Sequence, residues 1–97
     1  MFIVLLRFAE NKSRAGEFMA AHNAWLQQGF EDGVFQLAGG LAPSMGGALL
    51  ALESSASELQ ARIDRDPFVE EGIVTPEILQ IDPKRAVDRL DFLLDRS

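Results

Sequence analysis

Near its N-terminus the chain reads Phe2-Ile3-Val4-Leu5-Leu6-Arg7-Phe8. Successive side chains of a β-strand point to opposite faces of the sheet, and here both alternating sets are mainly apolar. A strand with two apolar faces has to be covered on both sides, which is typical of the interior of a sheet. The stretch therefore predicts a central strand that has another strand on each side.

The next elements follow from periodicity and from turn residues. Apolar residues recur at helical spacing over about residues 13–31, and Asp32-Gly33 is a suitable helix end. Two further strands are predicted at 34–42 and 47–53, joined as a hairpin by the turn Pro43-Ser44-Met45-Gly46.

The second half of the chain also predicts helices and a strand. A short helix with serines at its start ends before Pro67, and one further helical turn is predicted over 68–72. Residues 73–81 predict a fourth strand, which we expect either to lie at a sheet edge or to begin late, because Pro76 cannot donate to a ladder. Asp82 is a suitable N-cap and Pro83 a suitable first residue for a C-terminal helix over about 83–95.

The resulting order is β-α-β-β-α-β followed by a helix, which is the ferredoxin-like plan of an α+β protein. We expect one domain over 1–97, with a core of about 1–81. This plan leaves one sheet face without helices, and we place Leu5, Leu49 and Ala51 on that face. An exposed apolar face is typical of an interface, so a homodimer that buries sheet against sheet is predicted.

Composition excludes several classes of function. The chain has no cysteine, and its formal net charge of −6 disfavours binding to nucleic acid. The apolar run near the N-terminus is interrupted by Arg7 and has no basic segment before it, so we do not expect a signal peptide or a membrane span. A cytoplasmic protein is the expectation.

One histidine and one aspartate are the candidates for chemistry. His22 is the only imidazole, the group whose ordinary pKa lies nearest neutrality. Asp66 follows a helix and is held out of helical geometry by Pro67, where it could meet another side chain across a cleft. A carboxylate beside a histidine fixes its tautomer and stabilises its charged form. His22 could instead be a core histidine, and Asp66 a cap for the turn that follows it.

Several short motifs occur together in a fixed order. They are His22-x-x-Trp25-Leu26, Gly33 before a strand, Ala38-Gly39-Gly40-Leu41, Gly46-Gly47, and Asp66-Pro67-Phe68 followed by Gly72. In this combination the chain resembles the YciI-like (YCII-related) proteins from Met1 to about Ile81. The resemblance implies a dimeric α+β barrel with a His–Asp pair, which maps to His22 and Asp66. It also implies isomerisation or elimination on a small organic molecule, without a cofactor.

Other residues are weaker candidates for contact with a substrate. Gly39-Gly40 could let a ligand approach the strand backbone or could form a β-bulge. Ser44 lies in the predicted turn, and Phe68 could be either a core residue or a platform for a flat ligand. No metal site is expected, because one histidine and scattered carboxylates lack ligand spacing. The alternatives to an enzyme are a binding protein of the same fold without turnover, and an accessory subunit that docks a larger partner.

Overall fold

The strand β1 (Phe2–Phe8) lies in the interior of a four-stranded antiparallel sheet, as its two apolar faces predict. In this computed structural model, which describes residues 1–94, the strand order is β2-β3-β1-β4. The other strands are β2 (Phe35–Leu41), β3 (Gly46–Ala51) and β4 (Val74–Gln80). The predicted ferredoxin-like plan is confirmed, and β4 occupies an edge, which was one of the two alternatives for this proline-containing strand.

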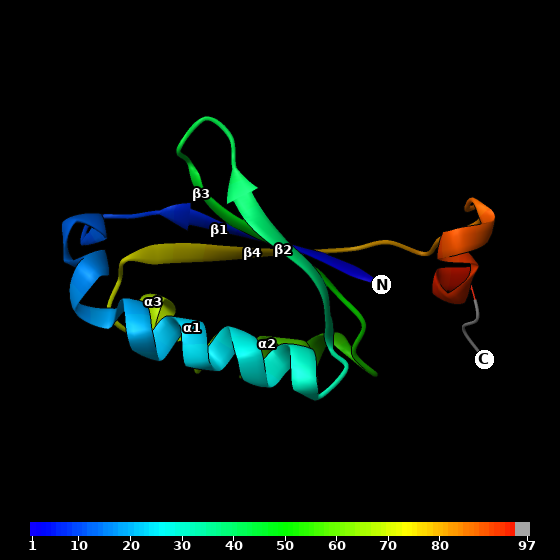
Figure 1. The fold of residues 1–97 in the computed structure, drawn as a ribbon, viewed down its shortest axis with the longest axis horizontal. Helices are drawn as coiled ribbons and strands as arrows, with labels where there is room; N and C mark the ends of the chain where they lie inside the picture. Colours follow the sequence, from blue (N-terminus) through cyan, green and yellow to red (C-terminus); the bar gives the residue numbers. More distant parts are fainter. Residues whose placement is uncertain (95–97) are drawn as a thin grey trace.

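The helices lie together on one side of this sheet (Figure 1). A 3-10 turn, η1 (Lys12–Arg14), leads into the long helix α1 (Ala15–Glu31). The shorter helices are α2 (Ala56–Ile63) and α3 (Pro67–Glu70). Ser55 is the N-cap of α2, because its side chain accepts a hydrogen bond from the backbone N–H of Glu58.

The core fills the space between the sheet and the helices. Leu59 and Ile63 of α2 are fully buried there, together with Val4 of β1. Helix α1 approaches β2 closely at Gly29, where a Cβ would lie 2.2 Å from the ring of Phe35. Only a glycine allows this approach, and it brings the helix near the strands whose residues line the site.

The second face of the sheet differs from the prediction in its residues. Leu49 and Ala51 do not lie on it, because they are 3% and 0% exposed in the core beneath the helices. The register explains the error: Leu49 pairs with Val4 and Ala51 with Phe2, so all four point to the same side. The open face carries the residues that alternate with these, namely Ile3, Leu5, Ala48 and Leu50.

The alternative that Gly39-Gly40 form a β-bulge is wrong. Gly39 pairs with Ala48 and Gly40 with Gly47 in regular antiparallel register. The irregularity in β2 lies between Phe35 and Leu37 instead. The two glycines therefore belong to the regular part of the β2–β3 ladder.

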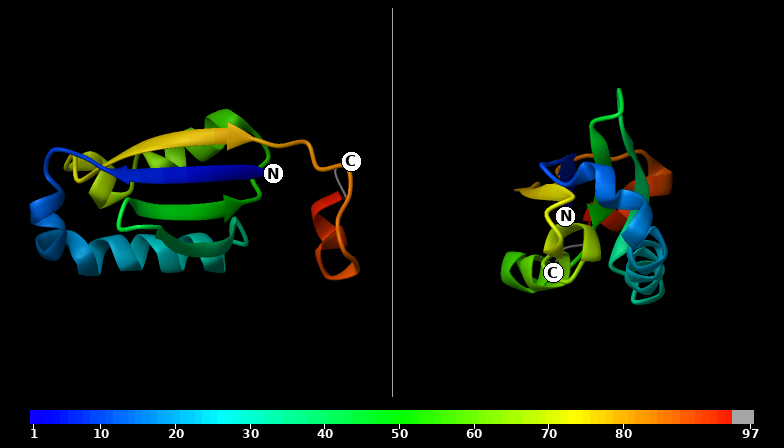
Figure 2. Two further views of the ribbon diagram at one scale, coloured as in Figure 1. Left: turned by 90° about the horizontal axis from the view of Figure 1, so that it is seen from above. Right: turned by 90° about the vertical axis from the view of Figure 1, so that its left-hand side faces the viewer.

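The C-terminal helix is shorter and tighter than predicted. Residues 82–87 are not helical, and a 3-10 helix, η2 (Asp88–Leu94), follows; residue 95 of the predicted helix lies outside the described residues. Asp82 does not cap a helix, because no helix begins beside it, and its carboxylate accepts a hydrogen bond from the Lys84 ammonium at 2.9 Å. The segment extends beyond the end of the sheet (Figure 2), with Val87 59% exposed. A helix that packs little apolar surface has little to stabilise it, because short isolated helices are marginal in water.

Candidate functional site

His22 and Asp66 meet between the helices and the sheet, although 44 positions separate them in sequence. The Nδ1 atom of His22 lies 2.7 Å from Oδ1 of Asp66. His22 projects from the middle of α1, and its side chain is 13% exposed, whereas that of Asp66 is 0% exposed. The structure therefore brings the two predicted residues into direct contact, with only the histidine reaching solvent.

Asp66 is positioned by the start of α3. It has extended backbone geometry, with φ −63° and ψ 124°, and Pro67 occupies the first turn of the helix. Its Oδ1 accepts a hydrogen bond from the backbone N–H of Phe68 at 3.0 Å. The same oxygen thus caps α3 and accepts from His22, so the capping role and the contact with the histidine coexist. Oδ2 is buried and has no hydrogen-bond partner among the described residues.

This hydrogen bond selects one tautomer of the imidazole. An ionised carboxylate can only accept, so Nδ1 of His22 carries the proton and donates it to Asp66. In the neutral ring the free lone pair is then on Nε2. A proton acquired there would be stabilised by the buried carboxylate on the opposite side of the ring. The arrangement has the chemical capacity of a general base.

Two aromatic rings hold the plane of the imidazole. Phe68 stacks on His22 with ring centroids 4.0 Å apart and an interplanar angle of 3°. The ring centroid of Trp25, one turn further along α1, lies 5.9 Å from that of the imidazole. The indole N–H of Trp25 donates to the backbone carbonyl of Arg62 at 3.0 Å, which ties α1 to α2. Phe68 is 6% exposed, so it serves both as a core residue and as a support for His22.

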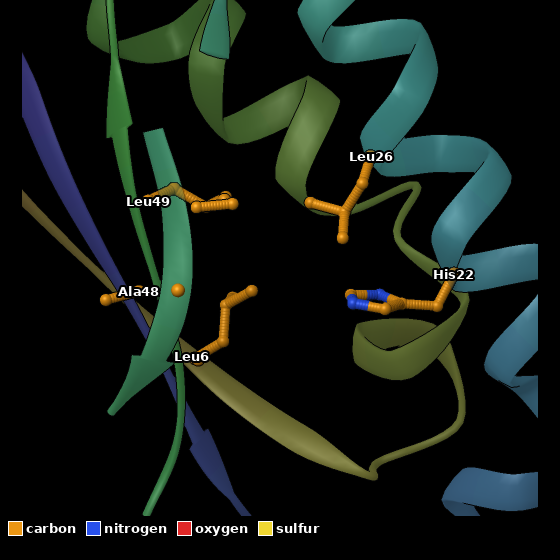
Figure 3. A pocket seen from close by; sticks show the side chains of 8 residues that line it. Leu6, His22, Leu26, Ala48 and Leu49 are labelled. Carbon is orange, nitrogen blue, oxygen red and sulfur yellow. The ribbon is translucent and has the colours of Figure 1, made fainter. Parts of the chain in front are cut away.

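Two cavities adjoin the imidazole, with volumes of about 260 and 210 Å³. Figure 3 shows the larger one, with the His22 ring projecting from α1 toward Leu6 and Leu49 of the sheet. Both cavities are lined by Leu6, His22 and Gly47. The larger adds Leu26, Ala38, Gly39, Ala48 and Leu49. The smaller adds Phe8, Met19, Asn23, Gly46, Phe68 and Val74. Together they form an apolar cleft on both sides of the histidine.

The predicted substrate-contact residues are only partly brought together. Gly39 lines the larger cavity and Phe68 the smaller one. Gly40 lines neither, although it pairs with Gly47, which lines both. Ser44 also lines neither, because it lies at the tip of the turn between β2 and β3, with a positive φ of 55°.

Sequence reasoning missed three cleft residues on α1. Met19, Asn23 and Leu26 line the cavities and stand three residues before, one after and four after His22. Positions three and four apart share one face of a helix, so the spacing from His22 was the available signal for Met19 and Leu26. The spacing gave no such signal for Asn23, which is the next residue in the chain. Asn23 is the one of the three that can form hydrogen bonds.

Neither a metal site nor a membrane span is indicated in the described part of the chain. Residues 1–94 contain no group of three or more histidine, aspartate or glutamate side chains arranged to hold a metal ion. None of the described helices is both long enough and apolar enough to cross a membrane.

The family follows from comparison with known domains. Residues 1–81 match the family model described as the YCII-related domain. The chain belongs to the YCII-related family. This confirms the resemblance in the sequence motifs, and the match ends at the last residue before the C-terminal segment.

A solved structure shares the fold of this YCII-related chain. The 5-chloro-2-hydroxyhydroquinone dehydrochlorinase of Burkholderia phenoliruptrix, in complex with 2,5-dihydroxybenzoquinone, superposes with a TM-score of 0.69 and 18% sequence identity. The match covers 84% of this chain and 93% of the dehydrochlorinase. No curated protein sequence matches the chain. At this level of identity, the comparison shows that the two chains share a fold.

Proposed function

We propose that this YCII-related protein is an enzyme that transfers a proton on a small ring-shaped organic molecule, with His22 as general base and Asp66 as its partner. One observation carries the proposal. The only imidazole of the chain donates to a fully buried carboxylate at 2.7 Å and faces an apolar cleft with the rest of its ring. A base in this setting is oriented, is shielded from bulk water and can keep a proton that it has accepted.

The proposed chemistry is an elimination or an isomerisation. Nε2 of His22 takes a proton from the substrate, and the electron pair of the broken bond to hydrogen forms a new double bond. In an elimination, the bond to a leaving group X breaks and X departs as the anion. The imidazolium then releases its proton to water, so the balance is loss of HX. In an isomerisation, the imidazolium returns the proton to a different atom of the same molecule. Neither balance requires an oxidant, a reductant or a cofactor.

The shape of the cleft supports a flat, largely apolar substrate. Its walls are aliphatic and aromatic side chains, and the paired glycines Gly40 and Gly47 leave the sheet without side chains beside it. The related fold of a dehydrochlorinase whose structure holds 2,5-dihydroxybenzoquinone favours a substituted six-membered ring and a halide as leaving group. We assign Gly39 and Phe68 as substrate contacts on these grounds.

Binding and turnover are measurable separately. Trp25 is the only tryptophan and lies 5.9 Å from His22, so its fluorescence should be quenched when 2,5-dihydroxybenzoquinone enters the cleft. Chloride release from 5-chloro-2-hydroxyhydroquinone should exceed the rate in buffer. Quenching without chloride release would favour the alternative, a binding protein without turnover. Absence of both responses would contradict the proposal.

We also propose that the protein is a homodimer, built on the open face of the sheet. Leu5 lies at the centre of this face, opposite Ala48 on β3 and Glu77 on β4. The substitution Leu5→Lys should give monomers, because a lysine cannot be buried without a partner across an apolar interface. The fold itself should tolerate the change, since a lysine there faces Glu77 on the neighbouring strand.

Light scattering coupled to gel filtration tests this assembly. The wild type should have twice the chain mass of 10.7 kDa, and an interface on the order of 1,200–2,000 Å² in total would account for it. Gln60→Lys, an exposed change on α2, is the control and should leave the dimer intact. A monomeric wild type at micromolar concentration would contradict the assembly.

A further inference from the structure

The smaller cavity has an uneven distribution of polar groups. Its lining is otherwise apolar side chains and two glycines, and His22 and Asn23 are the two residues there with polar side chains. A carbonyl or hydroxyl group that entered this cavity would lose its hydrogen bonds to water, at a cost of about 1–3 kcal/mol if nothing replaced them. Among the described residues, Asn23 is the side chain besides His22 that can replace these hydrogen bonds on this side of the histidine.

Asn23 is also free to make such a contact. Its side chain has no hydrogen-bond partner among the described residues and is exposed at the cleft. Its neighbours on α1 differ in this respect: Gln27 donates to Glu31 at 3.0 Å, and Gln28 donates to Asp32 at 2.8 Å. Asn23 lines the smaller cavity, and its amide is not paired with the next turn of its own helix in the described part of the chain.

We propose that the side chain of Asn23 binds a polar substituent of the substrate and thereby fixes which ring atom faces Nε2 of His22. The inference rests on the proposed function of the cleft and adds a specificity-determining residue to it. A flat ring between two apolar walls can rotate in its own plane, and one hydrogen bond beside the base removes that freedom. Asn23 adjoins His22 in the chain and lines the same cavity, so it suits this role.

The chemistry of an amide narrows the class of substrate. Its NH₂ group donates and its carbonyl accepts, so Asn23 can bind a quinone oxygen as readily as a phenolic hydroxyl. The larger cavity, lined near His22 by Leu26 and Leu49, offers no such side chain to the opposite edge of the ring. The expected substrate is a ring that carries oxygen substituents on the edge beside Asn23 and an apolar or halogenated edge away from it.

Isotope labelling gives a direct test, because the chain contains two asparagines. Protein labelled with ¹⁵N-asparagine has two side-chain amide signals, from Asn11 and Asn23. Titration with 2,5-dihydroxybenzoquinone should shift the Asn23 signal. The Asn11 signal should stay in place, because that amide already donates to the carbonyl of Glu71 at 2.8 Å. A quenched Trp25 with an unmoved Asn23 signal would overturn the role of Asn23 and leave the proposed function standing.

Variants measure the size of the effect. Asn23→Ala should weaken binding of 2,5-dihydroxybenzoquinone about 3- to 10-fold, the loss expected for one hydrogen bond. Asn23→Asp should weaken it further, because a carboxylate can only accept and repels the oxygens of the ligand. Gln27→Ala, an exposed change on the same helix, is the matched control and should bind as the wild type does.

The outcomes separate the two proposals. Equal affinity in Asn23→Ala and wild type would overturn the inference about Asn23 while Trp25 quenching still supported the cleft as a binding site. A wild type in which neither Trp25 nor Asn23 responds to 2,5-dihydroxybenzoquinone would overturn both.

Discussion

Replacing His22 with alanine is expected to lower the rate of chloride release by about 10²- to 10⁴-fold, the range that a positioned general base contributes. The reason is that, among the described residues, no other side chain of the cleft lining can take a proton: this lining is apolar apart from His22 and Asn23, and an amide is not a base at neutral pH. The release is followed with a chloride electrode, and circular dichroism confirms that the variant is folded.

A second variant separates the charge of Asp66 from its role as a cap. Asn is as good an N-cap as Asp, so Asp66→Asn keeps the hydrogen bond from the Phe68 N–H and the start of α3. It removes the negative charge that stabilises the imidazolium, so the rate should fall by about 10-fold or more with little loss of stability. Chloride release that survives unchanged in both variants would exclude His22 and Asp66 as the catalytic pair.

The largest expected effect on stability comes from Gly46, at the start of β3. Its φ is 132°, and a Cβ there would lie 1.9 Å from the backbone carbonyl oxygen of Leu6. The obstacle is backbone of the central strand, which cannot rotate away as a flexible side chain can. Gly46→Ala should therefore lower the free energy of unfolding by about 3–5 kcal/mol, from strain and loss of the strand pairing together. Urea denaturation measures this change directly.

Gly39→Ala is the matched control for that experiment. It is the same substitution in the neighbouring strand, but a Cβ at Gly39 meets nothing within 4 Å, and no positive φ is required there. The free energy of unfolding should change by less than about 1 kcal/mol, with stabilisation expected from the reduced freedom of the unfolded chain. Equal destabilisation by both substitutions would show that general loss of glycine, and not the approach of β3 to β1, accounts for the effect.

Local patterns in the sequence predicted most of the fold. The run Phe2–Phe8, which is apolar on both faces, predicted a central strand, and Pro76 favoured an edge. Both inferences depend only on burial and hydrogen bonding within one segment. The same local signals failed at the C-terminus. Asp82-Pro83 is a favourable helix start, yet a favourable start cannot replace packing against a core, and helix forms only from Asp88.

Local sequence patterns could not predict which residues lie on which face of the sheet. Leu49 and Ala51 alternate correctly within β3, but which set of residues meets the helices depends on pairing with β1. A register shift of one residue exchanges the two faces of a strand, so both residues of β3 were placed on the wrong face, whereas Leu5 of β1 lies on the open face as predicted. Pairing of Leu49 with Val4 resolves it.

The candidate site was likewise predicted only in part from the sequence. His22 and Asp66 could be nominated from residue type and from the motifs around them, because few side chains here can carry acid–base chemistry. Their hydrogen bond at 2.7 Å, the stacking of Phe68 on the imidazole and the position of Asn23 at the cleft depend on how α1 and α3 pack together over the sheet. These are distances between segments remote in sequence, and they are set by the burial of the common core. The sequence identifies the chemical groups, and the packing of the helices on the sheet brings them together.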